Sequence, residues 1–184
     1  VTEQNNNNNF SNITVTAATT IAGWRSTDGG SPTKTVTGNT FSNWTGGTSQ
    51  LTGLAVSFSG SANVSNNTVS NFNCACTIVG LESSSGTQTF VQNTVHTLSS
   101  SGALVVTGLL NSGGTTQTHS RNKIYGLSNS NAGGSVSGIT VSAGTTVNLQ
   151  NNLIGDFTTP AANAAIPLTG INVSGGTTVN VDFN

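Results

Sequence analysis

The sequence predicts an all-β fold, a right-handed parallel β-helix (β-solenoid) of about six coils, each of about 29 residues and three short strands. Thr, Asn, Ser and Gly make up more than half of the 184 residues, and good helix formers are scarce. Apolar residues recur at a period of about 29 residues along the chain. Parallel crossovers are right-handed by default, which sets the expected hand of the winding.

The repeating unit begins with a strand-like piece, G-φ-x-φ-S, where φ is an apolar residue. A short turn leads into T-T-V-N-φ-x-N-N-x-φ-x-x-φ, which holds the second and third pieces, and a variable stretch of 9 to 13 residues closes the unit. Residues 53–72 and 138–157 are two clear copies. Each piece has the length of a short strand, and no piece has helical periodicity.

Four apolar columns can be followed from repeat to repeat. They are Trp24, Leu54, Leu81, Leu109, Ile139 and Ile171; Val36, Val64, Phe90, His119, Leu149 and Val181; Phe10, Phe41, Val69, Val95, Ile124 and Ile154; and Ile13, Trp44, Phe72, Leu98, Leu127 and Phe157. Alternate side chains of a strand point to one face, so these columns should fill the bore of the solenoid. Low overall hydrophobicity is expected, because such a core is only one side chain wide.

A column of asparagines follows the second strand of each repeat. Its members are Asn8, Asn39, Asn67, Asn93, Asn122, Asn152 and Asn184. Asn tolerates the left-handed conformation that a sharp turn needs, and stacked amides can hydrogen-bond along the axis as a ladder. We therefore expect a structural role for this column.

The runs at residues 151–162 and 170–181 resemble the repeats of very large secreted β-helix proteins on the surfaces of Bacteroidetes and Chlorobi bacteria. The resemblance covers nearly the whole chain, although the relatives are usually far longer. It implies an extracellular or cell-surface location and a right-handed parallel β-helix. It implies no activity, because such repeats serve as stalks, adhesins or scaffolds, and a fold does not fix a function.

Composition excludes several functions. Nine charged residues with a net charge of −1 cannot supply the phosphate contacts of a nucleic-acid-binding protein. No apolar run approaches the 18 residues of a membrane-spanning helix. The five carboxylates, Glu3, Asp28, Glu82, Asp156 and Asp182, fall in five different places of the repeat. We therefore expect no enzyme, and no motif suggests a cofactor or a metal.

Three further features leave alternatives open. Cys74 and Cys76 lie two residues apart, so a strained disulfide, two thiols and a link between subunits are all considered. Two outward columns carry mostly Thr or Asn, among them Thr87 and Thr89. They predict ordinary solvent-facing strand residues or, alternatively, a flat hydroxyl face like that of ice-binding solenoids. His96 and Tyr125 share an outward column, whereas His119 lies in an inward one.

The chain reads as one domain, residues 1–184, in mid-coil at both ends and without a recognisable cap. The residues expected to form the assembly ends are Val1, Thr2, Glu3, Gln4, Val179, Val181 and Phe183. Uncapped, partly complementary ends predict head-to-tail stacking of one copy on the next, which yields a filament. The alternatives are a stalk or adhesin segment of a larger surface protein, or a glycan-binding β-helix whose partner is a cell-surface glycan. Tyr125 is the one good outward aromatic candidate for that last role.

Overall fold

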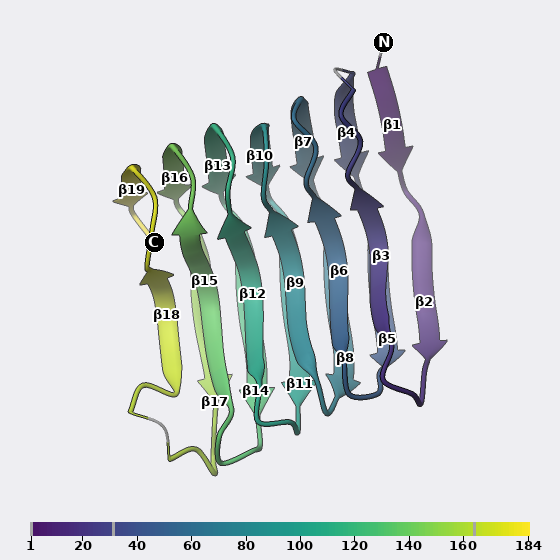
Figure 1. Ribbon diagram of the computed structural model, residues 1–184, viewed down its shortest axis with the longest axis vertical. Coiled ribbons are helices and arrows are strands. Elements are labelled where there is room, and N and C mark those ends of the chain that lie inside the picture. Colours follow the sequence, from purple (N-terminus) through teal and green to yellow (C-terminus); the bar gives the residue numbers. More distant parts are fainter. Residues whose placement is uncertain (1, 31, 164) are drawn as a thin grey trace.

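The computed structural model describes residues 2–30, 32–163 and 165–184, which form a stack of β-coils (Figure 1). The described residues contain 19 strands in three parallel sheets and no helix. The prediction of an all-β parallel solenoid of about six coils with three strands per coil is confirmed.

Each coil visits sheets A, B and C in turn, so neighbours within a sheet are three strands apart in the chain. Sheet A contains β1 (Thr2–Asn6), β4 (Thr33–Thr37), β7 (Ser61–Ser65), β10 (Thr87–Val91), β13 (Thr116–Ser120), β16 (Thr146–Gln150) and β19 (Thr178–Asp182). Sheet B contains β2 (Asn9–Thr14), β5 (Thr40–Thr45), β8 (Thr68–Cys74), β11 (Thr94–Ser100), β14 (Lys123–Asn129) and β17 (Leu153–Thr158). Sheet C contains β3 (Thr20–Ser26), β6 (Gln50–Val56), β9 (Thr77–Ser83), β12 (Val105–Ser112), β15 (Ser135–Ala143) and β18 (Leu168–Val173).

The four predicted apolar columns are runs of directly paired positions. Phe41, for example, pairs with Phe10 on one side and Val69 on the other. In the middle coils these side chains are fully buried, and Trp44 stacks on Phe72 with the ring centroids 4.4 Å apart. The core is therefore a continuous file of side chains along the axis, to which each coil adds a few members.

A glycine near the middle of each sheet-C strand lets sheet C approach sheet B closely. A Cβ on Gly80 would lie 2.6 Å from Val95 Cγ1, and one on Gly108 would lie 2.3 Å from Ile124 Cγ2. No side chain fits in this space in the first five of these strands, so glycine lets the two sheets approach there; at Gly170 on β18 an added Cβ would meet nothing within 4 Å. The strands bend at this position, and outward residues on either side of it, such as Val79 and Glu82, are three apart instead of two.

The position of left-handed backbone differs from the sequence-based expectation. The ladder asparagines do not adopt positive φ; the residue before each one does, including Asn66 (φ 55°), Asn151 (φ 54°) and Gly38 (φ 67°). A second set lies within the sheet-B strands, where Asn43 and Asn71 also have positive φ. The ladder asparagines are thus kept for hydrogen bonding, because the preceding residue turns the chain.

Candidate functional surfaces

The asparagine ladder runs unbroken along the corner between sheets A and B. Each side-chain Nδ2 donates to Oδ1 of the asparagine in the next coil at 2.7–3.0 Å, from Asn8 through to Asn184. The same Oδ1 accepts the backbone N–H of the preceding coil's asparagine, as Asn122 does from Asn93. The second N–H of the same Nδ2 donates to a carbonyl oxygen of the preceding coil's sheet-A strand, as from Asn93 to Val64.

This ladder has a direction. Among the described residues none donates to Oδ1 of Asn8, so the N-terminal end shows a bare acceptor. At the other end, the backbone N–H of Asn184 has no acceptor in the described part of the chain. A donor end and an acceptor end are complementary, so another coil at either end can extend the ladder.

Buried polar side chains close the corner between sheets C and A. Asn111 donates to the carbonyl oxygens of Gly113 and Ala143, and this orientation presents its Oδ1 to His119 Nε2 at 2.9 Å. The hydrogen of His119 therefore lies on Nε2, and Nδ1 is buried without a partner among the described residues. Burial lowers the pKa of His119 to about 3, so the imidazole is neutral at neutral pH.

At the corner between sheets B and C, one register position carries a different residue in each of three successive coils, and each residue bonds to the turn in its own way. Cys74, Ser100 and Asn129 occupy the same column. Cys74 forms a disulfide with Cys76, and Ser100 Oγ donates to the Cys76 carbonyl at 2.7 Å. Asn129 Nδ2 donates to the Leu104 carbonyl at 2.7 Å. Of the alternatives left open by the sequence, the structure has the intrachain disulfide, as a local brace of this corner.

One charged cluster lies at the N-terminal end, and the sequence reasoning missed it. Lys34 is 1% exposed, points into the bore, ion-pairs with Glu3 and donates to Asp28 Oδ2 at 2.7 Å. Its ammonium also lies 4.8 Å from the centroid of the Phe58 ring. Burial alone would lower the pKa of Lys34, but the hydrogen bonds to Asp28 and Glu3 outweigh it and raise the pKa. The alternation of Lys34 with Thr35 and Val36 was the signal that could have shown it pointing inward.

The five carboxylates are spread over the stack, and two of them share one partner. Glu3 and Asp28 meet at Lys34, and Glu82, Asp156 and Asp182 lie apart from them on other columns. Among the described residues, no three His, Cys, Asp or Glu side chains gather in a way that could hold a metal ion. The same residues include no helix long and apolar enough to cross a membrane.

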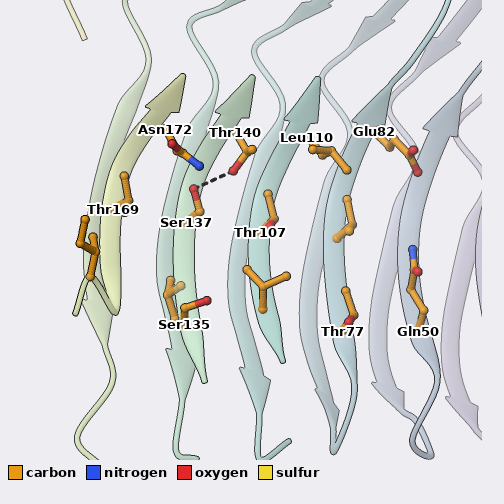
Figure 2. A pocket seen from close by; sticks show the side chains of 14 residues that line it. Gln50, Thr77, Glu82, Thr107, Leu110, Ser135, Ser137, Thr140, Thr169 and Asn172 are labelled. Carbon is orange, nitrogen blue, oxygen red and sulfur yellow. Dashed lines mark hydrogen bonds between the residues drawn. The ribbon is translucent and has the colours of Figure 1, made fainter. Parts of the chain in front are cut away.

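A groove runs along the outer face of sheet C. Its larger part, about 480 Å³, crosses β6, β9, β12, β15 and β18, and Figure 2 shows Thr107, Ser137 and Thr169 along its floor. A smaller hollow of about 230 Å³ shares Gln50 and Glu82 with it and continues to Arg25 on β3. Thr107 is only 4% exposed although it faces outward, because the sheet bends inward at the glycine column. The groove follows from the way in which sheets B and C pack.

The outer face of sheet A carries the predicted hydroxyl columns. Thr87 pairs with Ser61 and Thr116, and Thr89 pairs with Asn63 and Thr118, so both columns run along the solenoid axis. These side chains are exposed or half-buried.

The two end faces differ in chemistry. At the N-terminal end, β1 places Glu3 and Asn5 at the inward positions of sheet A, beside Lys34 and Val36. At the C-terminal end, β19 places Val179 and Val181 in the corresponding columns. Large apolar side chains are exposed there: Leu168 (42%), Val173 (48%), Val181 (46%) and Phe183 (89%).

Of the residues expected to form the assembly ends, Thr2, Glu3 and Gln4 lie on β1, whereas Val179 and Val181 lie on β19 and Phe183 follows it. Val1 lies outside the described residues. The structure therefore puts the two predicted sets at opposite ends of the stack. One set is polar and the other is apolar.

Comparison of the chain with protein-family models, with curated proteins and with solved structures finds no match in any of the three.

Proposed function

We propose that the protein is a structural subunit of an extracellular filament in which solenoids stack end to end. The observation that carries this proposal is the apolar C-terminal end face, where Val179 and Val181 continue columns of the core toward solvent and Phe183, at the turn that follows, is 89% exposed. An exposed file of core residues beside unpaired strand edges is a surface suited to parallel strand addition.

The strand count indicates how the copies join. In the described part of the chain, sheet A has seven strands, and sheets B and C have six each. The coils form one continuous helical winding that passes through sheets A, B and C in turn. If no strand position is left empty in sheets B and C at the seam, sheet A has a single position there. Either β19 or the next copy's β1 can occupy it, but not both. In our proposal β19 takes the position of β1 and pairs with β4 of the next copy.

Side-chain chemistry favours this exchange. If β19 paired with β1, Val179 and Val181 would lie against Glu3 and Asn5, and the Glu3 carboxylate would be buried beside a valine. Against β4, Val181 instead meets Val36, and Val179 meets the alkyl chain of Lys34, which keeps Asp28 as its partner. The ladder also continues, because Asn184 then lies beside Asn39 of the next copy.

Pairs of cysteine substitutions test the seam. Adjacent positions of parallel strands lie within the Cα distance that a disulfide spans. The pair Asn180→Cys with Thr35→Cys should give a ladder of disulfide-linked oligomers on non-reducing gels. Asn180→Cys with Gln4→Cys should link only if β19 pairs with β1, and Asn180→Cys with Asn63→Cys, in the middle of sheet A, is the matched control. All four positions face outward, so folding should be retained.

Electron micrographs give an independent measure of the same geometry. Six coils at about 4.8 Å predict a subunit rise of roughly 29 Å, whereas a seam with seven sheet-A strands predicts roughly 34 Å. Separate particles that are each one solenoid long, together with no oligomers from any of the three cysteine pairs, would contradict the filament proposal. They would favour a stalk or adhesin segment, in which other coils cover the C-terminal end face.

A further inference from the structure

Equivalent positions of successive coils can be compared because the chain repeats. On one surface, the residues of two coils differ from those of the other coils. At the outward position held by Ser11, Ser42 and Ser70 in the first three coils, the next two coils carry His96 and Tyr125. His96 and Tyr125 are half-buried on the outer side of sheet B and do not point into the bore, so packing of the core does not explain the change.

Neighbouring outward columns change in the same two coils. The column of Thr40, Thr68 and Thr94 continues with Lys123 on β14. The turn column, which has Asn or Gly in most coils, has Gln92 and Arg121 in these two. Both keep a left-handed backbone, with φ 57° and 55°, in which residues other than Gly and Asn are disfavoured. The residues that differ from the repeat therefore lie together in two neighbouring coils, and two of them hold a strained backbone conformation.

These residues border a hollow at the corner between sheets A and B. The hollow has a volume of about 370 Å³ and is lined by Asn66, Gln92, Thr94, Arg121 and Lys123. Two of the four basic residues of the chain lie here, and neither forms an ion pair with any described residue. The hollow thus has unneutralised positive charge beside amide and hydroxyl groups that both donate and accept hydrogen bonds.

An aromatic surface adjoins the hollow. His96 and Tyr125 stack with their ring centroids 5.1 Å apart and their planes within 6°. His96 covers one face of the Tyr125 ring, and the next position of the column is Gly155, where an added Cβ would meet no atom within 4 Å. The second face of Tyr125 is therefore open. It lies two residues along β14 from Lys123, on the same side of the sheet.

We propose that this corner, defined by the hollow together with His96 and Tyr125, binds an anionic saccharide. Arg121 and Lys123 bind the carboxylate or sulfate group through charge-assisted hydrogen bonds. Gln92 and Asn66 hydrogen bond the hydroxyl groups, and the apolar C–H face of a sugar ring packs on Tyr125. Asp156 follows Gly155 at the far side, which places the anionic group at the Arg121 side by repulsion. The proposal does not depend on filament assembly, because the corner lies on the flank of the stack.

The test is titration calorimetry of the protein with three probes: a galacturonic acid trisaccharide, a heparin-derived sulfated hexasaccharide and neutral maltotriose. We expect at least one anionic probe to bind, with affinity that falls as NaCl rises, and maltotriose to bind at least tenfold more weakly. The double variant Arg121→Gln with Lys123→Gln should weaken the anionic probe at least tenfold, and Tyr125→Ala about fivefold. Thermal melts should show that these substitutions, all on the outer side of the stack, leave the fold intact.

Arg25→Gln is the matched control, since it removes a positive charge from the groove of sheet C instead. It should change affinity less than twofold. Equal weakening by Arg25→Gln would move the site to that groove and overturn the proposal. Failure of both anionic probes to bind at millimolar concentration, or equal binding of maltotriose, would also overturn it. Binding of the galacturonic acid trisaccharide would show that a carboxylate without sulfate is sufficient.

Discussion

Left-handed backbone positions recur in sheet B, and the residue at each of them decides the local strain. Asn12, Asn43, Asn71 and Gly126 are types that accept positive φ readily, but Thr97 has φ 55° in the same column. A β-branched residue is disfavoured in this region, because its branched Cβ crowds the backbone. Thr97 is therefore a single strained position in an otherwise suitable column.

Thr97→Asn should stabilise the protein by about 1 kcal/mol, because it restores the residue type found at Asn43 and Asn71. Urea unfolding of parent and variant measures the change. The control is Thr94→Asn on the same strand, whose backbone is extended and which should lose stability, since Thr is the better strand residue. A Thr97→Asn variant less stable than the parent would show that the His96–Thr97 hydrogen bond outweighs the strain.

His119 links stability to pH. Its pKa is lowered from 6.5 to about 3 in the folded state by burial, so the unfolded chain binds a proton between these values and the folded chain does not. The free energy of unfolding should then fall as pH falls from about 6.5 to about 3, by up to about 1.4 kcal/mol per pH unit. Above pH 6.5 this contribution is fully present.

Urea unfolding at pH 7 and pH 4.5 tests this linkage. We expect a loss of about 2–3 kcal/mol in the parent between these pH values and little of it in His119→Gln, which keeps a donor for Asn111 but does not titrate. His96→Gln is the control, because the pKa of His96 is also lowered by burial but that residue is only partly covered. A pH slope that is unchanged in His119→Gln would assign the effect to other groups.

At the scale of the elements, the strands are short and the corners between them carry the specific fastening. The A–B corner uses the asparagine ladder, the C–A corner uses Asn111, His119 and buried glutamines, and the B–C corner uses the Cys74–Cys76 disulfide or its polar equivalents. Each of these sets of side chains forms hydrogen bonds or a covalent bond at a turn, where the backbone polar groups lie outside the strands. The side-chain bonds at the corners therefore stabilise the turns, while the apolar columns stabilise the packing of the strands.

Asn93→Ala should destabilise the protein by about 3 kcal/mol or more, because it removes the side-chain donor to the Val64 carbonyl and the acceptor of both the backbone N–H and the side-chain Nδ2 of Asn67, all in a buried place. Thermal or urea unfolding measures the loss. Asn63→Ala, on the exposed face of sheet A, is the matched control and should change stability by less than about 0.5 kcal/mol. Equal effects would mean that the ladder adds nothing beyond strand pairing.

Repetition along the chain explains which of these corner interactions could be predicted from the sequence. The Asn column repeats in every coil, so its ladder could be predicted from sequence. The fastenings at Cys74, Ser100 and Asn129 use three residue types in one column and show no repeat. The sequence pattern predicts the left-handed residue one position too late, because consecutive asparagines such as Asn66 and Asn67 are equally suited to positive φ and only the folded backbone distinguishes them.

At the scale of the whole molecule, each coil touches only its neighbours, so stability is close to a sum of stacking terms. The middle coils are covered on both sides, while the end coils keep partly exposed core residues such as Phe10, Trp24, Phe157 and Ile171. The polar inward residues of β1 lessen this exposure at one end. The valines of β19 do not lessen it at the other.

Hydrogen exchange should therefore be graded along the axis in the unassembled protein. Amides of β7 to β15 should exchange on the order of 100-fold more slowly than those of β17 to β19, because the end coils open without unfolding the rest. Mass spectrometry of peptides after exchange measures this gradient. In filaments the β19 amides should become as protected as those of β10; uniform protection in the monomer would contradict independent opening of the ends.

The sequence by itself determined the solenoid, its period, the four inward columns and the asparagine ladder, because each is repeated along the chain and a repeat makes the register readable. Only the tertiary structure decided the partners of Lys34, the pairing of Cys74 with Cys76, the groove of sheet C and the corner shared by Arg121, Lys123 and Tyr125. These features join residues from different coils or from the two sides of a turn. Their distances depend on how the strands bend and on how closely the sheets approach, which no single repeat records.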